Sequence, residues 1–98
     1  MSKNRKNVNV YNLNKYSNSL YLRIEVKDKP GVLSQITKQL ANRKISVARL
    51  IQIPDHKKKT ASIVIITHKT KEEDVQRCLK YLSSNKNILK NPILIRLL

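Results

Sequence analysis

The chain has 98 residues, which is enough for one domain but too few for separate cofactor-binding and substrate domains. Its single glycine excludes a glycine-rich phosphate loop, and its single cysteine excludes an internal disulfide, as is usual in a reducing compartment. The sequence contains no run of about 18 apolar residues and no secretory signal pattern. We therefore expect a soluble, cytoplasmic protein that does not bind a membrane.

The net charge of +15, from 21 basic and 6 acidic residues, is typical of proteins that bind nucleic acids. However, the basic residues are spread along the chain, apart from the run KKK at 57–59, and ten asparagines accompany them. The chain has only four tyrosines, and no Phe or Trp, to stack on bases. Composition therefore favours a solvated basic surface, with a nucleic-acid-binding domain as the least favoured alternative.

The segment 1–19 carries six asparagines, four basic residues and no acidic residue, and it has no apolar period. This composition predicts a disordered tail or linker, followed by one domain over 20–98. From Leu20 to Val26, apolar residues alternate with polar ones, which predicts a half-buried strand.

The sequence DKPG at 28–31 interrupts this strand and predicts the start of a helix, with Asp28 as its cap. Apolar residues then recur at helical spacing over 32–41. The basic sequence NRK at 42–44 predicts the end of the helix, where cations favour its dipole.

A second strand is predicted over 45–53, because Pro54 is expected to end it and the polar segment 54–60 follows. The next segment, ASIVIIT at 61–67, is continuously apolar and rich in β-branched residues. Such a run predicts a central strand that is covered on both faces.

Thr70 and Glu73 predict a capping box at the start of a second helix. The apolar face of this helix includes Cys78. The sequence NP at 91–92 then introduces a last predicted strand over 93–97.

The order strand, helix, strand, strand, helix, strand predicts an α+β, ferredoxin-like βαββαβ fold, in which two helices cover one face of a four-stranded antiparallel sheet. Right-handed crossovers place the first and third strands in the middle. Because the third strand is apolar on both sides, the face without helices also needs cover. A second copy of the domain is the simplest cover, so we expect a homodimer.

Enzymatic activity is not expected, because no catalytic constellation occurs. Cys78 lies on an apolar helix face, His56 lies in a basic loop, and His68 has no carboxylate near it in sequence. The acidic residues at 72–74 are explained by the helix dipole alone. Neither a metal site nor a cofactor site is predicted.

The junction KDKPGVL at 27–33 is the candidate ligand site. Gly31 lets a ligand approach the backbone, and free N–H groups at a helix start can receive a carboxylate. The carboxylate of Asp28 can accept hydrogen bonds from an ammonium or a hydroxyl group. These groups fit a free amino acid, while a simple capped turn is the alternative interpretation.

Two blocks, YLRIEVKDKPGVLSQITKQLANRKISVARLIQ and ASIVIITHKTKEEDVQRCLKYL, resemble an ACT domain, the amino-acid-sensing module of biosynthetic enzymes. The resemblance covers 20–98 and is greatest to the C-terminal ACT domains of homoserine dehydrogenases, and the end of the chain on its last strand fits such a position. It implies a non-catalytic regulatory module that binds threonine at a dimer interface for feedback inhibition. The catalytic part of a dehydrogenase is then a further partner, and a purely structural dimerisation module is the alternative.

The resemblance also implies an effector site. Asp28 takes its polar position, the junction supplies backbone N–H groups, and Ser46 opens the second strand. Arg43-Lys44 replaces the glycine usual after the first helix, so we expect a non-glycine residue in the left-handed conformation there. The implied site comprises Asp28, Lys29, Gly31, Val32, Leu33, Ser46 and Gln52.

Overall fold

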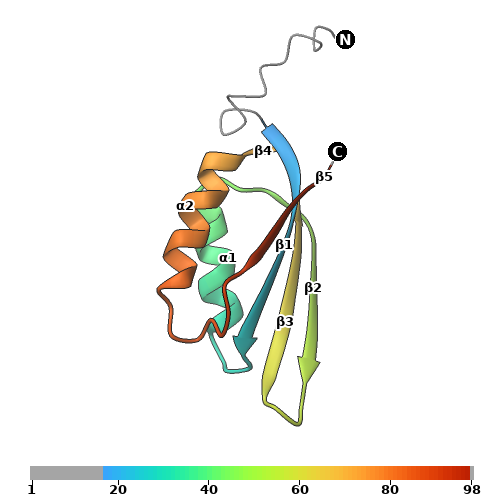
Figure 1. Cartoon of the computed structure of the whole chain (residues 1–98), viewed down its shortest axis with the longest axis vertical. Helices are drawn as coiled ribbons and strands as arrows, with labels where there is room; N and C mark the ends of the chain where they lie inside the picture. The colour runs from blue at the N-terminus through green and yellow to red at the C-terminus, as the bar shows by residue number, and fades with distance from the viewer. Residues whose placement is uncertain (1–16, 98) are drawn as a thin grey trace, which may run out of the picture.

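The computed structural model describes residues 17–97, so most of the predicted tail lies outside the described residues. Two helices pack on one face of an antiparallel sheet (Figure 1). No helix in this part of the chain is long and apolar enough to cross a membrane. The elements are β1 (Ser17–Lys27), α1 (Val32–Asn42), β2 (Val47–Asp55), β3 (Thr60–Thr67), β4 (Thr70–Lys71), α2 (Glu72–Ser83) and β5 (Ile93–Leu97).

The four long strands lie in the order β2-β3-β1-β5, and every neighbouring pair is antiparallel. The first and third long strands therefore occupy the middle of the sheet, and the predicted ferredoxin-like fold is confirmed. Its edges are β2 and β5.

The core lies between the sheet and the helices. The alternating residues of β1 point toward the helices, and Leu22 and Ile24 pair with Ile65 and Ile63 of β3 on the same face. As predicted, Cys78 is part of this core. The fully or almost fully buried residues that the strands and helices contribute are Leu20, Leu22, Ile24, Val26, Ala61, Ile63, Ile65, Val32, Ile36, Leu40, Val75, Cys78 and Leu82.

The predicted capping box at the start of α2 is wrong. Thr70 is buried and forms the short strand β4 with Lys71, which pairs with the beginning of β1. The helix therefore starts at Glu72, and no side chain caps it. The cause is a longer β1, which begins at Ser17 and gives Thr70 a strand partner.

Pro54 does not end the second strand, contrary to the prediction, because β2 extends to Asp55. An edge strand tolerates proline, since only one of its sides is hydrogen-bonded to a neighbour. β2 also begins two residues later than predicted, at Val47, because Ile45 is buried as part of the turn that ends α1.

The prediction that a non-glycine residue adopts the left-handed conformation after α1 is confirmed. Lys44 has φ 59°, and its amide donates to the carbonyl of Ala41 at 2.9 Å. The amide of Ile45 donates to the carbonyl of Leu40 at 2.9 Å. These two bonds form a Schellman motif, whose left-handed position favours glycine.

We expect Lys44→Gly to stabilise the domain by up to about 1 kcal/mol, because glycine has no Cβ to strain the left-handed backbone. Chemical denaturation followed by circular dichroism measures the change. As the control, Lys38→Gly at an exposed position inside α1 should cost about 1 kcal/mol. Equal destabilisation by both substitutions would contradict the argument.

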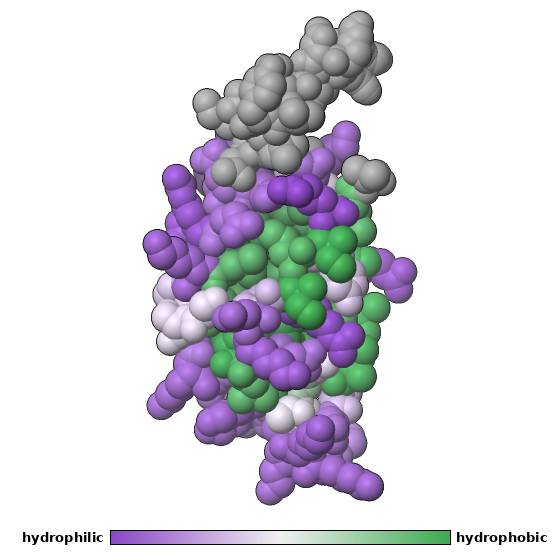
Figure 2. Space-filling view, in the orientation of Figure 1, coloured by the Kyte–Doolittle hydropathy of each residue, from purple (hydrophilic) through white to green (hydrophobic). Residues whose placement is uncertain are grey.

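The helix-free face of the sheet is apolar along both edge strands. Ile51 and Ile53 of β2 are 40% and 50% exposed, and Ile93 and Ile95 of β5 are 53% and 50% exposed. Between these edges, Val64 of the central strand β3 is only 8% exposed. Figure 2 shows apolar side chains along the side of the molecule that carries the strands.

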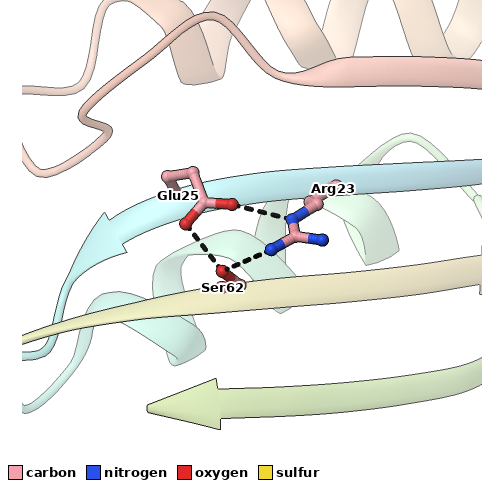
Figure 3. Close-up of polar contacts among 3 residues, drawn as sticks. All are labelled: Arg23, Glu25 and Ser62. Atoms are coloured by element: carbon pink, nitrogen blue, oxygen red, sulfur yellow. Dashed lines mark hydrogen bonds and ion pairs between the residues drawn. The ribbon is translucent and has the colours of Figure 1, made fainter. Parts of the chain in front are cut away.

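A polar trio interrupts this face between the two apolar edges (Figure 3). Glu25 accepts hydrogen bonds from the Ser62 hydroxyl at 2.6 Å and from Arg23 Nε at 2.8 Å, and Arg23 Nη2 donates to Ser62 at 3.2 Å. The hydrogen bond from Ser62, followed by that from Arg23, lowers the pKa of Glu25. The trio therefore contains one positive and one negative charge and has no net charge.

Candidate functional site

The junction between β1 and α1 is held against the turn between β2 and β3. The amide of Asp28 donates to the carbonyl of Lys59 at 2.9 Å, and the amide of Lys29 donates to the carbonyl of Lys27 at 3.0 Å. These bonds fix the chain just after β1, and they leave the side chain of Asp28 exposed.

Gly31 is the N-cap of α1 and has a left-handed φ of 87°. A Cβ at this position would meet no atom within 4 Å, so the backbone conformation and not lack of space favours glycine. The predicted capping of α1 by Asp28 is wrong, because no side chain makes a cap hydrogen bond here. Because Gly31 is the N-cap, Asp28 lies three residues before the cap position, and its carboxylate is not used by the helix.

The first amides of α1 are only partly used. The amide of Val32 donates to the carbonyl of Lys29 over a long 3.3 Å, and it is therefore a weak candidate donor. The amides of Gly31 and Leu33 donate to no other residue of the described chain. The junction thus combines two free N–H donors with one exposed carboxylate, as an α-amino acid requires.

A hollow of about 430 Å³ lies between the junction and the β2–β3 turn. Lys27, Asp28 and Lys29 line it from the junction. Lys58, Lys59 and Thr60 line it from the turn, and Leu89 lines it from the segment between α2 and β5.

The structure separates Ser46 and Gln52 from the other five predicted site residues. Ser46 follows the far end of α1, where its carbonyl accepts a hydrogen bond from the amide of His68 at 2.9 Å. An 11-residue helix spans about 16 Å, so Asp28 and Ser46 lie beyond opposite ends of α1. Figure 1 shows α1 running alongside the sheet. Gln52 lies midway along β2, paired with Ile63.

Sequence reasoning missed the residues that face Asp28 across the hollow. In the sequence, Lys58 and Lys59 are recognisable only as part of a basic loop, and no pattern distinguishes Leu89. The available signal was the concentration of three lysines at 57–59 in an otherwise even charge distribution. These lysines lie near Asp28 because β1 pairs with β3, and no local sequence motif predicts this pairing.

The described residues offer no catalytic thiol or metal cluster. Cys78 is fully buried, and burial raises the pKa of its thiol, so the nucleophilic thiolate is disfavoured. Among residues 17–97, no three His, Cys, Asp or Glu side chains lie close enough to hold a metal ion.

The chain is similar to known proteins in sequence and in fold. The ACT domain family model matches residues 20–80. Homoserine dehydrogenase of Neisseria gonorrhoeae is 34% identical over 85 residues, which are 87% of this chain and 20% of that protein. Homoserine dehydrogenase of Bacillus subtilis is 39% identical over 64 residues, 64% of this chain and 15% of that protein.

Solved structures agree with these matches. The crystal structure of a homoserine dehydrogenase from Thiobacillus denitrificans superposes with a TM-score of 0.75 at 27% identity, covering 86% of this chain and 18% of that one. The chain thus spans about a fifth of the length of these relatives.

Proposed function

We propose that this chain, which belongs to the ACT domain family, is a non-catalytic regulatory module that binds a free amino acid. The first candidate effector is threonine, and the regulated activity is that of a homoserine dehydrogenase in amino-acid biosynthesis. The related proteins named homoserine dehydrogenase support this assignment. The catalytic part of such an enzyme is the proposed partner.

The observation that carries the proposal is the pairing of free amides with an exposed carboxylate at the β1–α1 junction. The amides of Gly31 and Leu33 can receive the α-carboxylate of an amino acid, helped by the positive end of the α1 dipole. The carboxylate of Asp28 can accept hydrogen bonds from the α-ammonium. Two opposite charges at a fixed separation distinguish an α-amino acid from a simple anion.

We further propose that two copies share each site, because Ser46 cannot reach Asp28 within one chain. β2 is an edge strand, so the backbone groups on its outer side are free to pair with another strand. Antiparallel pairing of two β2 strands would bring the start of one beside the end of the other. The end of β2 leads into the turn that is hydrogen-bonded to Asp28, so this pairing would carry the partner's strand start toward the junction.

A second candidate function is assembly without an effector. It is favoured by the apolar residues exposed on the helix-free face, on β2 and β5. Such a surface suits packing against a second copy or another part of a larger enzyme. In this case the junction would be a structural turn.

Calorimetric titration of the chain with threonine, up to several millimolar, separates the two functions. Isoleucine, serine and lysine serve as controls, and light scattering gives the mass. A sensor should show saturable binding of threonine with two sites per pair of chains. Heat from none of the amino acids, together with a dimeric mass, would favour the assembly function.

A further inference from the structure

The hollow beside the junction has an excess of positive charge that an amino-acid effector does not require. Lys27, Lys29, Lys58 and Lys59 contribute to its lining, and Asp28 is the one acidic residue among the lining residues. A neighbouring hollow of about 230 Å³ shares Lys58, Thr60 and Leu89 with it, and its other charged lining residues are Lys90, Glu25 and Asp55. Figure 2 shows the hydrophilic side chains gathered at the end of the molecule where the β2–β3 turn projects.

The acidic side chains near the hollow have other partners. Asp55 accepts hydrogen bonds from the amides of Lys57 and Lys58 at 3.1 and 3.2 Å, and so holds the turn. Glu25 is bound by Arg23 and Ser62. Each of the three ion pairs among residues 17–97 has an arginine as its cation. None of the lysines of the hollow forms an ion pair within the described chain.

The backbone that carries these lysines is fixed. Thr60 pairs with Lys27 on β1 and with Asp55 on β2. The carbonyl of Lys59 accepts a hydrogen bond from the amide of Asp28. Lys59 has a left-handed φ of 55°, although it is not glycine. Folding thus brings together like charges from two segments and holds them on both sides of one hollow.

We propose that this hollow binds a small organic anion that carries a phosphate or diphosphate group. Ammonium groups bind phosphate oxygens as compact point charges, and four of them match a ligand with two or more negative charges. Leu89, which is 42% exposed, offers an apolar contact for the organic part. The volume lies within the range of small-molecule sites.

This inference is separate from amino-acid sensing, although the two sites share Asp28 and Lys29. A zwitterionic amino acid has no net charge, so an excess of lysines adds little to its binding affinity. Each lysine adds to the binding affinity of a diphosphate. The lysines of the turn, Lys58 and Lys59, belong to the anion site alone and therefore serve to test it.

The test is calorimetric titration of the chain with pyrophosphate at constant ionic strength. Titration with ADP, which adds a nucleoside to the same diphosphate, distinguishes an organic ligand from the free anion. The test variant is Lys58→Ala/Lys59→Asn, because asparagine tolerates the left-handed backbone at 59. The matched control is Lys38→Ala/Lys80→Ala, which removes the same charge from exposed positions on α1 and α2.

We expect saturable binding of pyrophosphate, tighter binding of ADP, and a loss of at least about tenfold in affinity in the turn variant. The control should stay within about twofold of the wild type. Lack of saturation, or equal weakening by both variants, would overturn the proposal in favour of a general basic surface. Tight binding of an oligonucleotide that both variants weaken equally would likewise overturn it, in favour of nucleic-acid binding.

Threonine titration of the same variants keeps this proposal distinct from the proposed function. If the turn variant loses pyrophosphate and retains threonine, both proposals stand. If the wild type binds pyrophosphate and not threonine, amino-acid sensing fails and the anion site stands. If it binds threonine and not pyrophosphate, only the anion site fails.

Discussion

Ile65→Lys is expected to unfold most of the domain. Ile65 is fully buried at the centre of the sheet, between Leu22 of β1 and Leu50 of β2, on the face that the helices cover. A lysine there would bury an ammonium group without a partner, at a cost of several kcal/mol. A domain of this size has a total stability of roughly 5–10 kcal/mol, so most of it would be lost.

Chemical denaturation and light scattering test this expectation. The variant should show a large loss of cooperative unfolding, and any dimer should disappear with the fold. Ile51→Lys is the matched control, because Ile51 is 40% exposed on β2 and a lysine can extend into solvent there. An unchanged unfolding curve for Ile65→Lys, or an equal loss in both variants, would refute the proposed core.

The fold follows from local patterns that agree with one another. The alternation from Leu20 to Val26 identifies the buried face of β1, and the helical spacing of Val32, Ile36 and Leu40 identifies that of α1. Once the order of the elements is known, right-handed crossovers leave one arrangement of the strands. Each of these signals depends only on neighbouring residues, so the sequence is sufficient to predict the architecture.

The errors fall where long-range contacts decide the local structure. Pro54 ends a central strand but is tolerated at an edge, and the edge position of β2 is a property of the whole sheet. Thr70 fits a helix cap by its residue type, yet its partner is the beginning of β1, more than fifty residues earlier. No local motif contains that information.

The candidate site divides in the same way. The junction from Asp28 to Leu33 is recognisable because a glycine stands between a strand and a helix. By contrast, Lys58 and Lys59 reach Asp28 through the pairing of β1 with β3, and spacing along the chain does not reveal this. The distance of Ser46 from the junction is likewise visible only once the length and direction of α1 are known.

Asp28→Ala should abolish the binding of an amino-acid effector and leave the fold intact. The carboxylate is exposed and makes no hydrogen bond or ion pair with another residue of the described chain. Its removal should therefore change the free energy of unfolding by less than about 0.5 kcal/mol. A lost charge-assisted hydrogen bond to the ammonium of the ligand corresponds to a loss of about tenfold to a hundredfold in affinity.

The matched control variant is Asp74→Ala, which removes the same charge from the first turn of α2. Threonine binding should survive in that variant and fail in Asp28→Ala, while both keep the mass of the wild type. Asp28→Asn retains one acceptor oxygen without the charge, so its affinity should fall between those of the wild type and the alanine variant. Equal threonine binding by Asp28→Ala and the wild type would show that the ammonium group is held elsewhere. An equal loss in Asp28→Ala and Asp74→Ala would show that net charge, and not a contact at the junction, governs binding.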